Sequence, residues 1–201
     1  MREWTPRQYG STVPVPGLRR PDQMRLPRWR PDPVRESIRW YARATVHKYW
    51  ADDDLTPITP LGLYGPRRST PFEVIEGDNL LLTVGATLVQ DRLAGVTSTA
   101  LDATNARMAV GDSTTPASAG QTDLQAATNK YRQVVDAAPN RSGATTQWVC
   151  TFGLAVANFP WNECGLSNAA SGANLVNRIV QNMGTKSSSQ QLVLTISATL
   201  A

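Results

Sequence analysis

The stretch QLVLTISATL, residues 191–200, decides the fold class of this chain. Leu192, Leu194 and Ile196 occupy every second position of this stretch. An extended backbone therefore places these three side chains on one face and those of the residues between them on the other. A period of two over ten residues indicates a strand with one face in a core. The end of the chain is therefore expected to be a long β-strand.

Working outward, residues 145–152 repeat this pattern, with Trp148, Cys150 and Phe152 on one face. Shorter runs of the same kind, separated by Gly, Pro, Asn and Ser, predict further strands at 106–110, 130–136, 162–166 and 175–180. We therefore predict a mainly β fold, an antiparallel β-sandwich-like domain over residues 77–201.

One helix is expected to pack on this domain. Asp78 can cap its first turn, an apolar run continues from Leu80 to Leu93, and Gly95 can end it in a left-handed conformation. About 125 residues are enough to bury a core of their own.

The N-terminal part has a different composition. Residues 1–76 hold 11 of the 14 prolines and 13 of the 20 Lys and Arg, against 9 Asp and Glu, so they carry the whole net charge of +4. Proline removes a backbone donor and disfavours helix in the residue before it. We predict that residues 1–76 form an extended Pro- and Arg-rich docking arm.

Aromatic residues in the arm are the candidates for partner docking. Trp4, Tyr9 and Trp29 lie in a segment that cannot build a core, although disordered segments are generally poor in aromatics. We expect these side chains to fill pockets on neighbouring proteins.

A helix is predicted near residues 33–50, with Asp32 as its cap and Pro33 at its first position. A basic stripe at a spacing of four would follow one face of it: Arg35, Arg39, Arg43 and His47. This stripe is either a solvated surface or a docking face for an acidic partner, and the acidic residues 52–54 could answer part of its charge.

The chemistry-bearing residues favour no enzyme class. His47 is the only histidine, and with Cys150 and Cys164 it cannot complete a four-ligand zinc site, so the two cysteines are interpreted as small buried residues. We find no phosphate-binding glycine loop and no dinucleotide fingerprint. We expect no catalytic residue, no metal and no cofactor, and no membrane segment, because no apolar run is long enough to span a bilayer.

The strand and turn at residues 106–112, which end in Gly111-Asp112, resemble the N-terminal domain of phage tail-collar fibre proteins. In that family a polar loop, a Thr-x-Leu step and a later Glu-x-Gly-Leu strand follow. Thr122-Asp123-Leu124 and Glu163-Cys164-Gly165-Leu166 match these two motifs.

The chain is also similar to a group of short phage virion structural proteins. The similarity lies in residues 105–113, 121–130, 168–172 and 183–186, so it covers roughly residues 77–201 and none of the arm. It implies a virion origin and transfers no catalytic residue. Tail-collar fibres continue into a long shaft, whereas this sequence stops at Ala201, which favours a decoration or adaptor role over that of a receptor-reaching fibre.

Three hypotheses follow. The first is a non-enzymatic capsid decoration or cement protein that contacts the major capsid protein through its arm. The second is a tail or baseplate adaptor, which would bind tail or baseplate proteins. The third is a nucleic-acid-binding protein that uses residues 1–50, where 11 basic residues face 4 acidic ones. We also expect a homo-oligomer, made in the host cytoplasm and carried in the virion.

Overall fold

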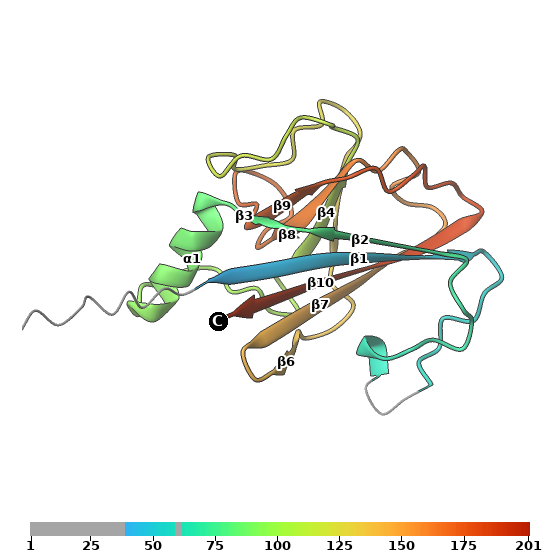
Figure 1. Cartoon of the computed structure of the whole chain (residues 1–201), viewed down its shortest axis with the longest axis horizontal. Helices are drawn as coiled ribbons and strands as arrows, with labels where there is room; N and C mark the ends of the chain where they lie inside the picture. Colours follow the sequence, from blue (N-terminus) through green and yellow to red (C-terminus); the bar gives the residue numbers. More distant parts are fainter. Residues whose placement is uncertain (1–38, 59–61) are drawn as a thin grey trace, which may run out of the picture. The chain divides into compact units, whose positions relative to one another are not determined.

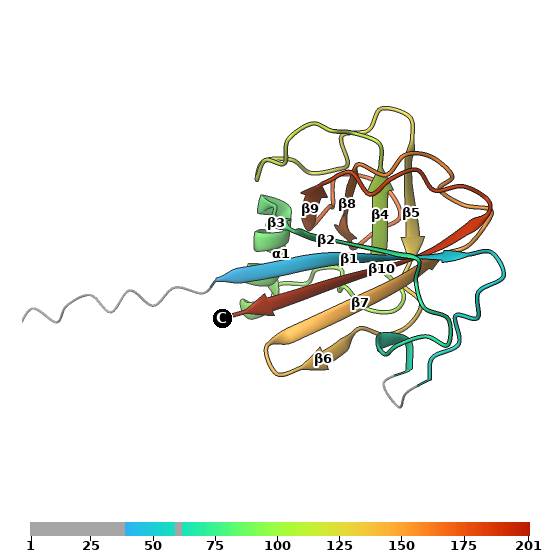
Figure 2. The ribbon, with the colours of Figure 1, turned by 45° about the vertical axis from the view of Figure 1, so that its right-hand side comes forward.

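The computed structural model describes residues 39–58 and 62–201, and the chain from Ile38 to Ala201 clusters as one compact unit. Two five-stranded antiparallel sheets pack face to face in this unit, with one α-helix at an end of the pair (Figures 1 and 2). The prediction of a mainly β sandwich with one helix is confirmed.

The first sheet has the strand order β2-β1-β10-β7-β6 and the second the order β3-β9-β8-β4-β5. Strands of the first sheet are β1 (Trp40–Trp50), β2 (Glu73–Asp78), β6 (Asn140–Ser142), β7 (Thr145–Phe152) and β10 (Gln190–Leu200). Strands of the second are β3 (Leu80–Leu81), β4 (Arg107–Gly111), β5 (Lys130–Val134), β8 (Glu163–Ser167) and β9 (Asn177–Val180). Two helices are α1 (Thr83–Leu93) and the single 3₁₀ turn η2 (Gly62–Tyr64).

The core lies between the sheets, and the alternation along β7 and β10 builds it as predicted. Leu194 pairs with Cys150 and Ile196 with Trp148, and all four side chains are buried. Strands β4, β8 and β9 supply the opposite layer: Met108, Val110, Cys164, Leu166 and Ile179. The six strands expected from the sequence are all present, each with ends shifted by at most a few residues.

The helix predicted near residues 33–50 is wrong over Trp40–Trp50, which form β1 between β10 and β2 (Figure 1). Residues 33–38 lie outside the described part of the chain. Residues four apart lie on the same face of a helix and also on the same face of a strand. The spacing of Arg39, Arg43 and His47 therefore could not distinguish a helix from a strand. Two observations favour the strand. The segment pairs with a neighbouring strand on both sides, and alternate residues are buried, namely Ala42, Ala44 and Val46.

The boundary predicted between residues 76 and 77 is wrong as well. Strand β1 pairs with β10 from Trp40↔Leu200 to Trp50↔Gln190, and β2 lies on its other side. A strand in the interior of a sheet belongs to the domain, so the sandwich begins near residue 39. Residues 55–76, which composition had placed in the arm, contain η2 and most of β2.

Helix α1 begins later than expected and ends where expected. Asp78 lies in β2, because the chain pairs with β9 through β3 before the helix starts at Thr83. Gly95 has a φ of 71°, the left-handed conformation that glycine adopts without strain, and the Val96 amide donates to the Asp91 carbonyl at 2.8 Å.

Candidate functional site

The structure separates the predicted docking residues into two groups. Trp4, Tyr9, Trp29 and Arg35 lie outside the described residues, so their roles stay predictions. Arg39 and Arg43 are described, and both lie on the outward face of the first sheet, because odd-numbered residues of β1 point away from the core.

Arg43 has acidic partners on the neighbouring strand. Its guanidinium contacts Glu76 at 3.2 Å and Asp78 at 3.9 Å, with about half or more of each of the three side chains exposed. The expectation that residues 52–54 answer this charge is wrong, because Asp53 caps the Trp50 amide and Asp54 accepts from Thr56 beyond the other end of β1. Exposed pairs of this kind add at most about 1 kcal/mol to stability.

Arg39 is exposed, and its backbone pairs with that of the last residue: the Arg39 amide donates to the Ala201 carbonyl at 2.6 Å, and the Ala201 amide to the Arg39 carbonyl at 3.0 Å. Among the described residues, the basic stripe therefore starts at the end of β1 where the chain pairs with its last residue.

His47 continues the stripe and lines a cleft of about 420 Å³ between the outward face of β1 and residues 63–71. Tyr49, Tyr64 and Val193 are also in its walls. Burial lowers the pKa of His47, the nearby Glu76 carboxylate raises it, and Arg67 lowers it further, so the net pKa lies below the ordinary value. Burial thus favours the neutral form of the imidazole.

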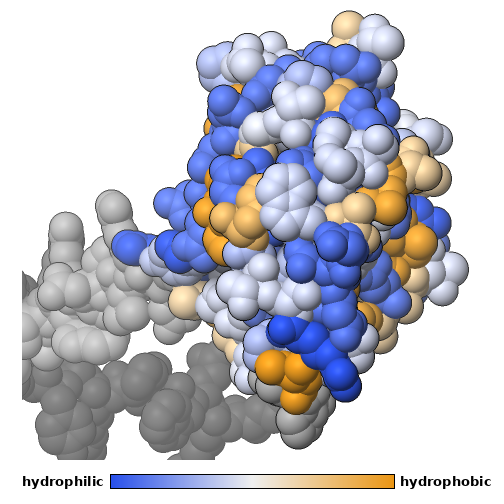
Figure 3. All heavy atoms as spheres, turned by 90° about the vertical axis from the view of Figure 1, so that its right-hand side faces the viewer, coloured by the Kyte–Doolittle hydropathy of each residue, from blue (hydrophilic) through white to orange (hydrophobic). Residues whose placement is uncertain are grey.

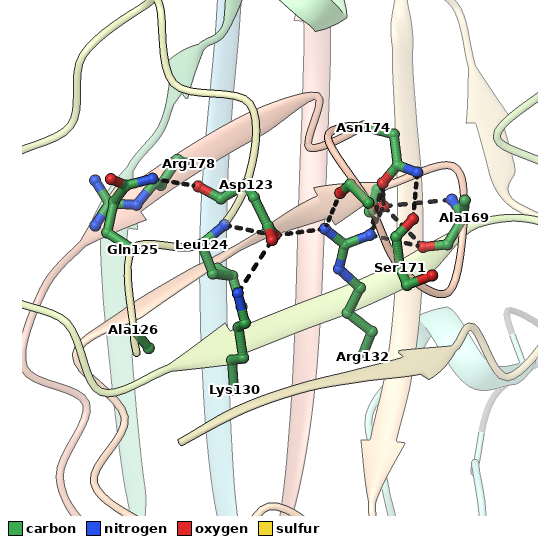
Figure 4. A network of polar contacts seen from close by, with 12 residues as sticks. Asp123, Leu124, Gln125, Ala126, Lys130, Arg132, Ala169, Ser171, Asn174 and Arg178 are labelled. Atoms are coloured by element: carbon green, nitrogen blue, oxygen red, sulfur yellow. Dashed lines mark hydrogen bonds and ion pairs between the residues drawn. The ribbon is translucent and has the colours of Figure 1, made fainter. Parts of the chain in front are cut away.

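A polar network covers the outer face of the second sheet, and sequence reasoning assigned no site residue to it (Figure 4). Its centre is an ion pair at 2.6 Å between Glu163 of β8 and Arg178 of β9, both completely buried. The Glu163 carboxylate also accepts the backbone amides of Gln125 at 3.0 Å and Ala126 at 2.8 Å.

Arg178 completes its hydrogen bonding on the same loop. Its guanidinium donates to the Gln121 side-chain oxygen at 2.9 Å and to the Thr115 carbonyl at 2.9 Å. We call residues 112–129 the strap, since this irregular segment between β4 and β5 is bound to the sheet by the Glu163–Arg178 pair. The strap has one large buried apolar side chain, that of Leu124. It packs with Leu82, Ala109 and Leu175.

A second arginine holds the other side of the strap. Arg132 of β5 donates to Asp123 at 2.5 Å and to Asn174 at 2.6 Å. Three further acceptors surround it: Ser167, the Ala169 carbonyl and the Gly172 carbonyl. Burial works to raise the pKa of Asp123, but hydrogen bonds from Arg132, the Leu124 amide and Lys130 outweigh it, so that pKa lies below its usual value.

The two carboxylates of the network belong to motifs that carry the phage resemblance. Asp123 comes from the Thr-x-Leu step, and Glu163 from the Glu-x-Gly-Leu strand. Gly165 of the same motif is required by packing, because a Cβ there would lie 2.1 Å from the Asn177 carbonyl. Arg132, Glu163 and Arg178 are charged residues within predicted strands, and this was the signal that could have marked a buried network.

The two cysteines are buried, as predicted, and neither is in a disulfide. Burial raises the pKa of Cys150 far above its usual value and that of Cys164 to about 12, so both thiols stay protonated. Cys150 faces the core from β7, whereas His47 faces outward from β1. The structure does not bring these two chemistry-bearing residues together.

Several large apolar residues are exposed on the surface. Viewed toward the end that carries residues 51–72, orange patches are divided by hydrophilic side chains (Figure 3). Trp50 and Phe72 stack there at 4.2 Å, both nearly half exposed. At α1, a groove of about 280 Å³ has walls that are almost entirely apolar.

Over residues 39–58 and 62–201, no cluster of three or more His, Cys, Asp or Glu could hold a metal ion. Neither helix in that part of the chain has the length and hydropathy needed to cross a membrane. Comparisons with family models, curated proteins and solved structures gave no match to this chain.

Proposed function

We propose that this chain is a non-enzymatic structural protein of a bacteriophage particle, which decorates or cements the capsid. The N-terminal segment is its anchor to neighbouring virion proteins. The sandwich is the folded body that this anchor holds on the particle.

The observation that carries the proposal is the bonding of the motif residues. The carboxylates of the two motif residues, Asp123 and Glu163, accept hydrogen bonds from two arginines outside the motifs, Arg132 and Arg178. Glu163 also accepts amides of the strap. A motif whose charges are fully used inside the fold acts as a scaffold. This supports carrying over the structural role implied by the resemblance to phage virion proteins.

The distribution of charge supports the arm as the anchor. Residues 39–201 contain 12 basic and 12 acidic residues, so the net charge of +4 comes entirely from residues 1–38. Trp4 and Trp29 lie in the same segment, and tryptophan and arginine are the residues that most often dominate interface energies.

The test is to locate the protein in particles. Antibodies against the sandwich would be applied to gradient-purified particles from cells carrying the phage that encodes this gene, by immunoblot and by immunoelectron microscopy. Label distributed over the capsid is the expected result. Label confined to the tail would replace the decoration role with that of a tail or baseplate adaptor. Particles free of the protein would contradict both.

The charge of residues 1–38 also favours a second candidate, nucleic-acid binding. A gel shift of the full chain with single-stranded DNA at two salt concentrations tests it. Binding that weakens steeply with salt, and that is lost when Arg25, Arg28 and Arg30 are changed to Gln, would favour this function over a protein anchor.

A further inference from the structure

The cleft beside His47 is a hollow of about 420 Å³ on the outward face of the first sheet. Its floor includes one row across three strands, because His47 of β1 pairs with Val74 of β2 on one side and with Val193 of β10 on the other. Tyr64 packs against the cluster of Tyr49 and Val193, so residues 63–71 cover this row and leave the hollow between. In Figures 1 and 2, η2 and the chain that leads from it to β2 lie at the end of the sheet where β1 ends.

The walls of the cleft combine apolar surface with a few polar side chains. Aromatic and apolar residues line much of it, among them Tyr49, Leu63, Tyr64, Pro66, Val74 and Val193. The polar side chains include those of His47, Arg67 and Thr195, and no Asp or Glu is among the described residues that line the cleft. A hollow of this size and composition is typical of binding sites for small organic molecules.

Arg67 carries the one permanent charge among the residues that line the cleft, and it is only 9 % exposed. Its guanidinium donates to the carbonyls of Leu55 at 3.2 Å and Leu63 at 3.0 Å, which have no net charge. No carboxylate of residues 39–58 and 62–201 is close enough to form an ion pair with it. Burial shifts the pKa values of His47 and Tyr49 most, and the Arg67 charge works to lower both, so the guanidinium lies near the floor of the cleft.

The other buried cations of the described chain show why this charge is unusual. Three of them have a carboxylate partner: Arg178 with Glu163, Arg132 with Asp123, and Lys48 with Glu73. Lys186 has no such partner among the described residues, but burial lowers its pKa, which makes loss of its proton easier. Arginine does not lose its proton in proteins, and a buried charge without a counterion is costly. An anion bound in the cleft would balance Arg67.

His47 can add a second positive charge beside Arg67. The charged groups that act on its imidazole are Glu76 of β2, which also contacts Arg43 at 3.2 Å, and Arg67, while its neighbour on β10, Val193, is uncharged. Burial favours the neutral imidazole in the empty cleft. An anion on Arg67 would raise the pKa of His47, because an opposite charge stabilises the imidazolium. Anion binding is therefore coupled to uptake of a proton.

We propose that this cleft binds a small organic carboxylate, with the carboxylate on Arg67 and an apolar ring against Tyr49 and Tyr64. A guanidinium can bind a carboxylate through two parallel hydrogen bonds, and a monoanion matches the single permanent charge. The apolar walls favour a ring-bearing molecule over a bare inorganic ion, because a ring removes apolar surface from water. The site is inferred from the sandwich alone and does not depend on a role in a virion.

Titration of the untagged full-length chain with benzoate tests this. His47 is the only histidine, so its ring protons give one set of NMR signals to follow. Benzoate should shift them to saturation. Benzamide has the same ring without the charge and should bind about ten times more weakly, because it cannot form the charge-assisted hydrogen bonds. Bound benzoate should also raise the pKa of His47, so its affinity should increase about threefold from about pH 7.5 to about pH 6.

Two pairs of variants assign the binding to the cleft. Arg67→Gln should weaken benzoate binding about tenfold, whereas Arg68→Gln, which removes the exposed charge next to it, should leave the affinity unchanged. Val74→Glu brings a carboxylate into the wall at a half-exposed position and should abolish binding, whereas Val74→Gln, of the same length, should retain it. Melting temperatures show whether each variant is folded. If Arg67→Gln unfolds because it loses its contacts with Leu55 and Leu63, the Val74 pair decides.

Four results would overturn the proposal. The absence of a saturable shift at His47 would show that benzoate does not enter the cleft. Equal affinities for benzoate and benzamide would show an apolar hollow without an anion site. Inorganic phosphate that binds as tightly as benzoate would show a site for any small anion, without use of the apolar walls. Equal affinities of the Val74→Glu and Val74→Gln chains for benzoate would place its binding elsewhere on the protein.

Discussion

Glu163 and Arg178, on the neighbouring strands β8 and β9, form an ion pair at 2.6 Å with neither side chain exposed. Burying two charges is costly, and the pair is stable only because the remaining acceptors and donors are satisfied by the strap. The second sheet and the strap therefore depend on each other.

The first prediction concerns this pair. Glu163→Gln keeps the shape of the side chain and leaves the Arg178 charge buried without a counterion, so the free energy of unfolding should fall by about 3–5 kcal/mol. Urea denaturation followed by tryptophan fluorescence measures it. Glu76→Gln, which affects the exposed pair with Arg43, is the matched control and should cost under about 1 kcal/mol. Equal effects would contradict a structural role for the buried pair.

The second prediction tests the register of β10. Leu194 is completely buried and faces Cys150, whereas Thr195 points to the outer face of the sheet. Leu194→Ala should lower the free energy of unfolding by about 2–5 kcal/mol, because it opens a cavity in the core. Thr195→Ala should change it little. Thermal and urea melts of the two variants decide, and two small changes would mean that the strand contributes no core.

The residues just discussed show which parts of the fold the sequence could predict. The alternation in 145–152 and 191–200 identified β7 and β10, because apolar residues at every second position over eight or more residues indicate a strand with one buried face. Strand β1 was misread because its spacing of four fits both helix and strand. Its partners, β10 and β2, are distant in sequence, and no local signal reports that pairing.

The site was predictable only in part. Trp4, Tyr9, Trp29 and Arg35 follow from composition and lie outside the described residues. The Arg132 network joins residues from 123 to 174, and such a network depends on how loops fold over a sheet. The alternation of apolar and polar residues indicates which face of a strand is buried. It carries no information about these loop contacts.

The third prediction follows from the central position of β1. A chain of residues 39–201 retains every described strand and should unfold cooperatively. A chain of residues 77–201 lacks β1 and most of β2, which exposes one whole edge of β10, and it should aggregate or show no melting transition. Circular dichroism melts and gel filtration compare the two. A cooperative transition in residues 77–201 would contradict the assignment of β1 to the core sheet.

The fourth prediction concerns pH. The pKa of His47 is lowered in the folded state, chiefly by burial, so between that pKa and the ordinary value near 6.5 the unfolded chain binds more protons. Stability from this residue is complete above about pH 6.5 and is lost as the pH falls through the folded pKa. The free energy of unfolding should therefore decrease from pH 7 to 5.5 by more in the native chain than in His47→Gln. Identical slopes would show that His47 does not titrate differently in the two states.

The last prediction is that residues 1–38 supply most of the affinity for the particle. Trp40 and Trp50 belong to β1, so residues 1–38 hold two tryptophans, Trp4 and Trp29, together with the net charge of +4. An extended segment loses conformational entropy when it docks, so it needs large aromatic or arginine anchors to bind at all.

Changing Trp4 and Trp29 together to alanine should accordingly abolish incorporation into particles, whereas the melting temperature of the sandwich should not change. Quantitative immunoblots of purified particles measure the incorporation. Arg35→Glu with Arg39→Glu should weaken incorporation in a salt-dependent way if these residues meet an acidic protein surface. Arg43→Glu is a poor probe of the same contact, because Arg43 already pairs with Glu76 and Asp78 within the sandwich. Full occupancy of the double tryptophan variant would show that the arm has another role, and nucleic-acid binding would then be the function to test.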